Sequence, residues 1–134
     1  MVTVVAAIIE NAGRVLIGQR RKGNGFGLKW EFPGGKVKSG ESLEAALARE
    51  LREELGAECR IGPEVYRTRF QYPEMRDALE LVFFSAAAAP DSVRNIVFEQ
   101  LRWALPAELP AVDFLPADRE LVAKLSRGKL KLKI

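Results

Sequence analysis

Runs of β-branched and other apolar residues alternate with short polar turns along most of the chain. Such runs, bounded by Gly, Pro, Asn or Asp, predict β-strands. The first two runs are separated by residues 10–13, Glu-Asn-Ala-Gly, which indicates a hairpin. We predict strands over residues 2–9, 14–19, 30–32, 58–71, 79–87 and 96–104.

Two helices are predicted between and after these strands. The first runs from Ser42, a typical N-cap residue, to Leu55, and Gly56 is the residue that ends it. The second is expected to be capped by Asp118 and to end near Gly128. Strands combined with two helices predict an α/β or α+β sandwich.

The other segments are predicted to be turns or loops. Residues 20–29 form a polar, glycine-rich loop with basic residues at its start, and residues 33–35, Pro-Gly-Gly, predict a turn that stops the third strand. The segment 105–118 is punctuated by proline and predicts a loop with one short helical turn. The tail 129–134, KLKLKI, alternates strictly, so it is either a solvated basic end or an edge strand.

Length and composition are those of an ordinary globular domain. The 134 residues fit a single domain spanning 1–134, and 48% of them are apolar, which is enough to bury a core. No apolar run approaches the length of a membrane span, and the N-terminus lacks the basic start and cleavage site of a signal peptide. We therefore expect a cytoplasmic protein with no membrane partner.

Histidine is absent from the sequence, and Cys59 is its single cysteine. This composition excludes Ser-His-Asp and Cys-His catalysis, an ordinary zinc site and an internal disulfide. A bound metal would have mostly carboxylate and carbonyl ligands, which suit magnesium, manganese or calcium. The net charge of +3 and the pI of about 9.2 are compatible with a polyanionic partner but do not require one.

The predicted first helix carries a crowded group of like charges. Glu50, Glu53 and Glu54 follow Arg49 within about one turn, and like charges three or four residues apart repel on a helix. On a wheel of about 100° per residue, Glu50 and Glu54 fall on the border of the leucine face. Burying an ionised carboxylate there is costly unless a cation meets it. The acids are therefore either surface charges paired with Arg49 and Arg52, or oxygen ligands for divalent cations.

The spacing of glycine and charged residues in this region resembles the Nudix box. The pattern is Gly-x5-Glu-x7-Arg-Glu-Leu-x-Glu-Glu-x-Gly, and it matches Gly35, Glu41, Arg49, Glu50, Leu51, Glu53, Glu54 and Gly56. Ala57 departs from the larger aliphatic residue usual in the family, which affects packing rather than chemistry. The WEFPGGK stretch before the box and the PAD sequence at 116–118 resemble MutT-type members, so the likeness covers most of the chain. It implies a Nudix-type α/β/α sandwich with a mixed central sheet and a catalytic loop-helix-loop.

The resemblance also implies an activity and a set of residues for it. MutT-type members hydrolyse a nucleoside triphosphate to the monophosphate and pyrophosphate with Mg²⁺ or Mn²⁺. The implied metal ligands are the Gly34 carbonyl and the carboxylates of Glu50, Glu53 and Glu54. Glu53 is also implied to orient or deprotonate the attacking water, while Arg49 orients the carboxylates and Glu41 supports Arg49. Carboxylates suit this task because they hold cations that in turn hold phosphates.

A further acidic ligand occurs in some relatives six residues before a tryptophan. Counting back from Trp103 gives Val97, which is not an acid. Glu99 lies two residues on and is expected to face the same side of a strand. It is therefore either a substitute metal ligand or a solvent-facing charge.

Four residues are candidates for binding the substrate. Asp118 matches the position at which MutT-type enzymes recognise the base, although it is equally placed to cap the last helix. Phe32 either contacts the base or packs in the core. Arg20 either contacts the nucleotide or is a solvated loop charge, and Arg76 is placed to reach phosphate.

Three functions remain open at this point. The first is a pyrophosphohydrolase that removes oxidised nucleotides such as 8-oxo-dGTP from the nucleotide pool. The second is an enzyme of the same chemistry acting on CTP, dCTP or a 5-substituted pyrimidine triphosphate. The third is a catalytically silent module that binds nucleotide or nucleic acid. We expect no stable nucleic-acid partner, since no aromatic and basic RNA-recognition motif is present, and a monomer or homodimer.

Overall fold

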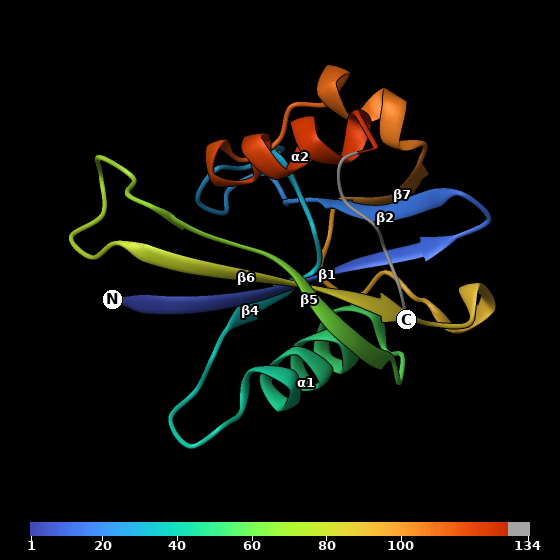
Figure 1. The fold of residues 1–134 in the computed structure, drawn as a ribbon, viewed down its shortest axis with the longest axis horizontal. Coiled ribbons are helices and arrows are strands. Elements are labelled where there is room, and N and C mark those ends of the chain that lie inside the picture. Colours follow the sequence, from blue (N-terminus) through green and yellow to red (C-terminus); the bar gives the residue numbers. More distant parts are fainter. Residues whose placement is uncertain (129–134) are drawn as a thin grey trace.

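A mixed sheet lies between two helical layers in the computed structural model, which describes residues 1–128 (Figure 1). The helix α1 (Leu43–Leu55) covers one face, and α2 (Arg119–Ser126) with the 3-10 helix η2 (Pro106–Ala111) covers the other. The remaining elements are β1 (Val2–Asn11), β2 (Arg14–Gln19), β3 (Trp30–Glu31), β4 (Gly34–Lys36), β5 (Arg60–Phe70), β6 (Leu79–Ala87), β7 (Gln100–Ala104), η1 (Pro90–Ser92) and η3 (Pro116–Asp118). This arrangement confirms the predicted α/β/α sandwich.

The central strand of the sheet is β1. Its residues 2–9 pair in parallel with residues 79–86 of β6. Its other edge is shared, because antiparallel β4 pairs with residues 4–6 and antiparallel β2 pairs only with residues 10–11. Within the described part of the chain the order is β3-β2-β1-β6-β5, with β4 beside β1 and β7 beside β2. Parallel and antiparallel pairs occur together, which confirms the predicted mixed sheet.

Alternating side chains of β1 belong to two separate cores. Val5, Ala7 and Ile9 are buried on the α1 side, whereas Ala6 and Ile8 are buried on the α2 side. A strand that is buried on both faces has few polar positions, which explains the nearly continuous apolar run in this part of the sequence. The sheet can therefore carry a helix layer on each face.

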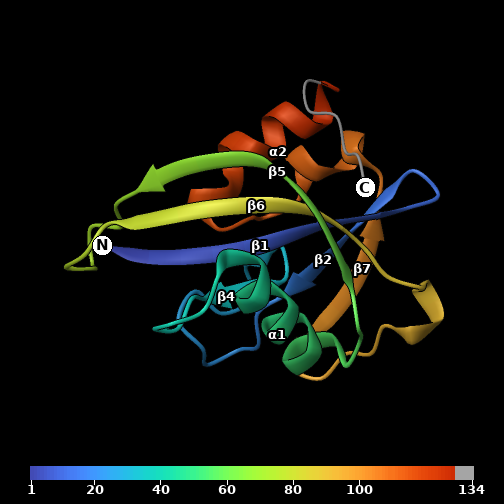
Figure 2. The same cartoon turned by 60° about the horizontal axis from the view of Figure 1, so that its bottom comes forward.

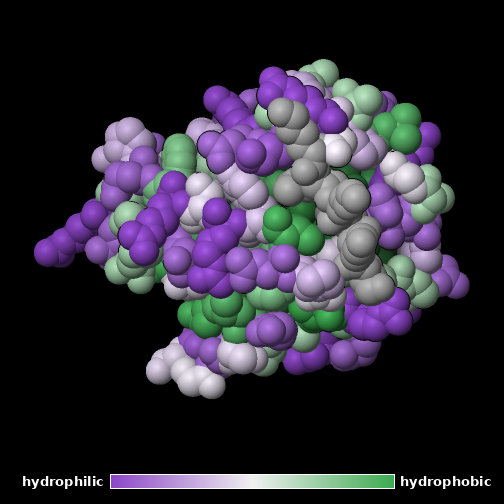
Figure 3. Space-filling model, viewed as in Figure 1, coloured by the Kyte–Doolittle hydropathy of each residue, from purple (hydrophilic) through white to green (hydrophobic). Residues whose placement is uncertain are grey.

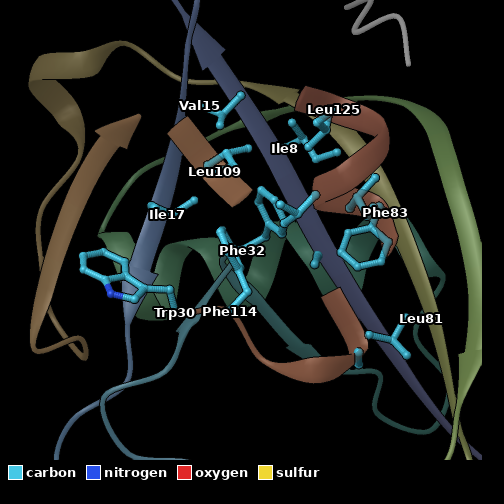
Figure 4. Close-up of a cluster of buried hydrophobic side chains, with 14 of the residues drawn as sticks. Ile8, Val15, Ile17, Trp30, Phe32, Leu81, Phe83, Leu109, Phe114 and Leu125 are labelled. Atoms are coloured by element: carbon cyan, nitrogen blue, oxygen red, sulfur yellow. The ribbon is translucent and has the colours of Figure 1, made fainter. Parts of the chain in front are cut away.

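Aromatic rings fill the core on the α2 side (Figure 4). Phe32 stacks on Phe114 with ring centroids 5.3 Å apart and meets Phe83 edge-on at 6.0 Å. Ring pairs of this geometry add to the stability gained from burial alone. They anchor the segment that leads from β3 into the glycine-rich strand β4.

The helix α1 begins and ends where the sequence predicts. The Ala45 N–H donates a hydrogen bond to Ser42 Oγ at 3.1 Å, which caps the N-terminus. Gly56 takes a left-handed φ of 63°, and its N–H donates to the Arg52 carbonyl at 3.0 Å. The helix lies against β4 and β1 (Figure 2), so the glycine strand and the acidic helix are neighbours.

Two predicted segments differ from the structure. The predicted turn at 33–35 contains the start of β4, because Gly34–Lys36 pairs with β1. A glycine-rich sequence carries no side-chain signal for such a strand, which exists only through its pairing. The strand predicted over 96–104 begins at Gln100, since the backbone N–H groups of Arg94 and Ile96 bind the last carbonyls of α1 instead of a neighbouring strand.

Asp118 occupies the N-cap position of α2, as predicted, but its side chain does not cap the helix. Asp118 belongs to η3, makes no side-chain capping hydrogen bond and is only 5% exposed. The helix α2 ends at Ser126, close to the predicted Gly128. The tail at 129–134, for which an edge strand was one alternative, lies outside the described residues.

Hydrophilic residues cover most of the face shown in Figure 3, with apolar residues in smaller groups between them. Across residues 1–128, there is no helix with both the length and the apolar character that a membrane crossing needs.

Candidate active site

Strand β4 lies directly against the acidic side of α1. The Gly34 N–H donates a hydrogen bond to Glu54 Oε1 at 3.1 Å. A Cβ atom at Gly35 would overlap the Glu50 carboxylate, and one at Gly34 would overlap the Val5 carbonyl. Glycine is required at position 34, where the obstacle is backbone, and at position 35 it lets the Glu50 carboxylate lie against the strand. Glu50 and Glu54 thus lie on the border of the apolar face, as the helical wheel predicts.

One arginine of the helix, Arg49, connects three acids of the box. Arg49 donates to both oxygens of Glu41, from Nε to Oε2 at 2.6 Å and from Nη2 to Oε1 at 3.0 Å. Its Nη1 donates to Glu50 Oε1 at 3.0 Å and to Glu53 Oε2 at 3.2 Å. Nη2 also donates to the Lys36 carbonyl at 3.1 Å, which joins the helix to β4. Such charge-assisted bonds fix both distance and direction.

Glu41 and Glu54 have pKa values shifted in opposite directions. The Arg49 hydrogen bonds, helped by the Lys38 N–H, lower the pKa of Glu41 to about 2, so Glu41 is ionised at neutral pH. Burial and the nearby Glu31 carboxylate raise the pKa of Glu54 to about 8, although the Gly34 N–H opposes this shift. Over the described residues Glu54 forms no salt bridge, because Arg49 pairs with the other acids and Arg52 pairs with Glu58.

A cavity of about 310 Å³ opens beside Gly34 and Glu54. The charged groups of its lining are Arg20, Glu31, Lys36, Glu54 and Asp118. Its larger apolar and aromatic groups are Phe26, Phe32, Tyr72, Met75, Leu79, Leu81 and Leu115. A concave site that combines an apolar wall with a few convergent charges is typical of small-molecule binding.

Two acids face this cavity together with Glu54. Burial, and next the Glu31 carboxylate, raise the pKa of Asp118 to about 8, so its carboxyl group is largely protonated at neutral pH and can donate as well as accept. Burial also raises the pKa of Glu31, even though Arg20 Nη1 lies 3.2 Å from Glu31 Oε1. The cavity therefore holds several acids and one arginine close to them.

The structure brings most of the candidate residues to one place. Arg20 lines the cavity and donates to Glu31, and Phe32 lines it while its ring packs in the core. Asp118 also lines the cavity. Arg76 is exposed in the turn between β5 and β6 and does not line it, although the neighbouring Met75 does.

Glu99 lies just before β7 and does not line the cavity. It is exposed, and its N–H donates to the Gln19 carbonyl at 2.8 Å. Val97 and Glu99 do not share a strand face as predicted, because β7 begins only at Gln100.

Three cavity residues were missed at the level of sequence. Glu31 offers the clearest signal, since a charged residue between the buried Trp30 and Phe32 needs a partner or a task. Tyr72 lies in the predicted break between two strands, yet it is 5% exposed and its hydroxyl accepts a hydrogen bond from the Ala117 N–H at 3.2 Å. Phe26 lies in a glycine-rich loop, where no pattern indicated it.

The residues beside the cavity fit a divalent metal ion. The donors are carboxylates and backbone carbonyls, which hard cations prefer. Glu54 is half-buried next to other acids without an arginine of its own, and a cation would relieve that repulsion. Among residues 1–128, no group of three or more acidic or cysteine side chains is arranged so that it could hold a metal ion. Glu50 and Glu54 face β4, whereas Glu53 points outward with 53% of its side chain exposed.

Comparison with known proteins agrees with this geometry. The profile of the NUDIX domain matches residues 1–125. A protein of Escherichia coli named CTP pyrophosphohydrolase is 36% identical over 91% of this chain and 89% of its own length. The 8-oxo-dGTP diphosphatase of Haemophilus influenzae is 33% identical over 93% of this chain and 91% of its own. The crystal structure of the MutT protein from Methanosarcina mazei superimposes with a TM-score of 0.82 at 26% identity, covering 95% and 94% of the two chains.

The chain belongs to the Nudix hydrolase family. Nucleotide pyrophosphohydrolase is the class of enzyme that this membership supports, and hydrolases of the family generally use divalent metal ions. The predicted family, fold and enzyme class are thereby confirmed, and the silent binding module is disfavoured. The single-domain organisation over 1–134 and the roles of individual residues stay predictions.

Proposed function

We propose that this protein hydrolyses a nucleoside triphosphate to the nucleoside monophosphate and pyrophosphate, with Mg²⁺ or Mn²⁺ as cofactor. One observation carries the proposal: the half-buried Glu54 carboxylate, which accepts a hydrogen bond from the Gly34 N–H, lines the same cavity as the buried Asp118. A cavity with an acidic side and an apolar side matches a substrate with a phosphate chain at one end and a flat base at the other.

The residues of the helix have separate tasks in this proposal. Glu50, Glu54 and the Gly34 carbonyl hold the metal, with Glu53 joining them. A divalent cation, when bound, neutralises phosphate charge and lowers the pKa of water. Glu53 is exposed and held in position by Arg49, so it is positioned to accept a proton from the attacking water. Arg49 is a positioning residue, and Glu41 holds Arg49 in place through two hydrogen bonds.

Binding of the phosphate chain and of the base falls to residues of the cavity. Arg20 lies beside Glu31 in the lining and is placed to exchange that carboxylate for phosphate oxygens. Lys36 lines the same region and adds a second cation. Arg76 is exposed next to Met75, and we propose that it contacts phosphate in a longer substrate. Glu99 is exposed before β7, and we propose that it becomes an additional metal ligand when substrate binds.

Asp118 supports two candidate bases. When protonated, its carboxyl group both donates and accepts, which suits the lactam edge of an oxidised guanine. When ionised, it only accepts, which suits the exocyclic amine of cytosine. The similarity to an 8-oxo-dGTP diphosphatase and to a CTP pyrophosphohydrolase supports both in equal measure. We put 8-oxo-dGTP first and CTP, dCTP or a 5-substituted derivative second.

A panel of nucleoside triphosphates, assayed for monophosphate and pyrophosphate with Mg²⁺ or Mn²⁺, tests the proposal. Glu53→Gln is expected to lower kcat at least 100-fold, since removal of a proton acceptor costs a factor of about 10² to 10⁴. Glu44→Gln is the matched control, because Glu44 is an exposed acid on the first turn of the same helix. Absence of metal-dependent turnover across the panel, or equal activity of both variants, contradicts the proposal.

A further inference from the structure

The loop at 20–29 is held in an unusual backbone conformation beside the cavity. Phe26 and Leu28 have φ angles of 58° and 66°, in the left-handed region that bulky side chains rarely occupy. The loop is closed on itself, because the Leu28 N–H donates to the Arg20 carbonyl at 2.9 Å and Arg20 Nε donates to the Gly25 carbonyl at 2.7 Å. Strain of this kind persists only where surrounding contacts hold it, and it is concentrated at functional sites.

The two strained residues differ in where they lie. Phe26 is 38% exposed and lines the cavity, whereas Leu28 is 43% exposed and is not part of the lining. A partly exposed aromatic ring at the wall of a cavity loses apolar burial that folding alone would favour. Its position is explained if a flat ligand completes its burial.

Tyr72 packs against Phe26 at the cavity. The two ring centroids are 4.8 Å apart at a tilt of 44°, and Phe70 packs on Tyr72 at 4.7 Å. The Tyr72 hydroxyl accepts a hydrogen bond from the Ala117 N–H, and Ala117 precedes Asp118. The aromatic pair and the buried acid are therefore joined through one side chain and line one cavity.

We propose that Phe26, packed against Tyr72, is the wall of the cavity that stacks on the flat ring of the nucleobase. The inference rests on the proposed function for the identity of the ligand and deepens it. The ring contact selects a heteroaromatic group of any base type, since every base presents a π-face. Asp118 then distinguishes among bases by their hydrogen-bonding edge.

Direct binding, measured by calorimetry without metal and therefore without turnover, tests this wall. The probes are GMP and CMP, which carry a base, and ribose 5-phosphate, which does not. Phe26→Ala is expected to weaken binding of GMP and CMP about 5- to 150-fold, the range for losing one base–aromatic stack. Phe26→Leu keeps an apolar side chain and is expected to lose most of the same affinity, whereas Phe26→Tyr restores it.

Leu28→Ala is the matched control, since it truncates an exposed apolar residue with the same backbone strain in the same loop. It is expected to change the affinity for either monophosphate less than twofold, and all variants are expected to bind ribose 5-phosphate like the parent protein. Equal losses for Phe26→Ala and Leu28→Ala, or an unchanged Phe26→Ala, would overturn the proposal. A parent protein that binds GMP through Phe26 but hydrolyses no triphosphate would refute the proposed function and leave the wall standing. A parent protein that hydrolyses triphosphates but binds GMP and CMP equally well with and without the Phe26 ring would support the proposed function and refute the wall.

Discussion

The buried carboxyl group of Asp118 makes the stability of the metal-free protein depend on pH in an unusual direction. Its pKa is raised from an ordinary value near 3.8 to about 8, chiefly by burial. Between these values the folded state holds a proton that the unfolded state has released. The free energy of unfolding therefore falls as pH rises through this window, and the contribution of Asp118 is complete below pH 4 and lost above pH 8.

The size of the effect follows from the shift. One proton bound only by the folded state changes the free energy of unfolding by about 1.4 kcal/mol per pH unit. Across pH 5 to 8 this amounts to roughly 4 kcal/mol, an upper bound because Glu31 shares the site and also has a raised pKa. Asp118→Asn removes the titration while keeping size and shape.

Urea unfolding with a chelator at unit steps of pH from 5 to 9 measures this difference. The free energy of unfolding of the parent minus that of Asp118→Asn should fall by about 2 to 4 kcal/mol from pH 5 to pH 8 and then level off. Asp91→Asn, which changes an exposed carboxylate, is the control and should leave the pH profile of the parent unchanged. Parallel profiles for the parent and Asp118→Asn would refute the assignment of a protonated buried acid.

Two further substitutions test the contacts between α1 and β4. Arg49→Lys keeps the charge but loses the bidentate contact with Glu41. In steady-state assays, kcat should fall about 10- to 100-fold and the metal concentration for half-maximal rate should rise. Arg52→Lys on the same helix is the control and should leave both values unchanged. Gly35→Ala places a methyl group on the Glu50 carboxylate, which can swing away, so denaturation should show a loss of only about 1–3 kcal/mol while turnover falls at least tenfold. A Gly35→Ala enzyme of full activity would show that Glu50 does not act from its present position.

The crowding of acids on α1 has a physical explanation in these contacts. Arg49 sits between Glu41, Glu50 and Glu53 and neutralises part of their repulsion. Glu54 is left out of this network and is held by a backbone N–H instead. Salt bridges with Arg49 therefore account for the positions of Glu41, Glu50 and Glu53 in the metal-free protein, and Glu54 is the acid that a cation would most stabilise.

Local signals were sufficient for the elements that depend on local interactions. Ser42 and Gly56 set the ends of α1 through hydrogen bonds within one turn, so both ends were predictable. The spacing of the box residues is likewise local, because a helix places residues three and four apart on one side. The placement of Glu50 and Glu54 beside the apolar face followed from that periodicity alone.

Residues brought together by distant segments could not be predicted in this way. Strand β4 exists because glycine permits close pairing with β1, and neither glycine carries a side chain that would signal it. Asp118 had the right residue type for a helix cap, but the packing of η3 buried it in the cavity. Its altered pKa is a property of that burial and of its neighbour Glu31, which lies 87 positions earlier in the chain.

The sequence by itself determined the acidic helix, its caps, the two-sided apolar strand and the family, because these depend on spacing within short stretches. Only the tertiary structure decided which groups share the cavity, since Phe26 and Glu31, Tyr72, and Asp118 come from three separate stretches of the chain. Burial and neighbouring charge, which set the protonation of a carboxyl group, are properties of a folded surface. A linear pattern of residues does not contain them.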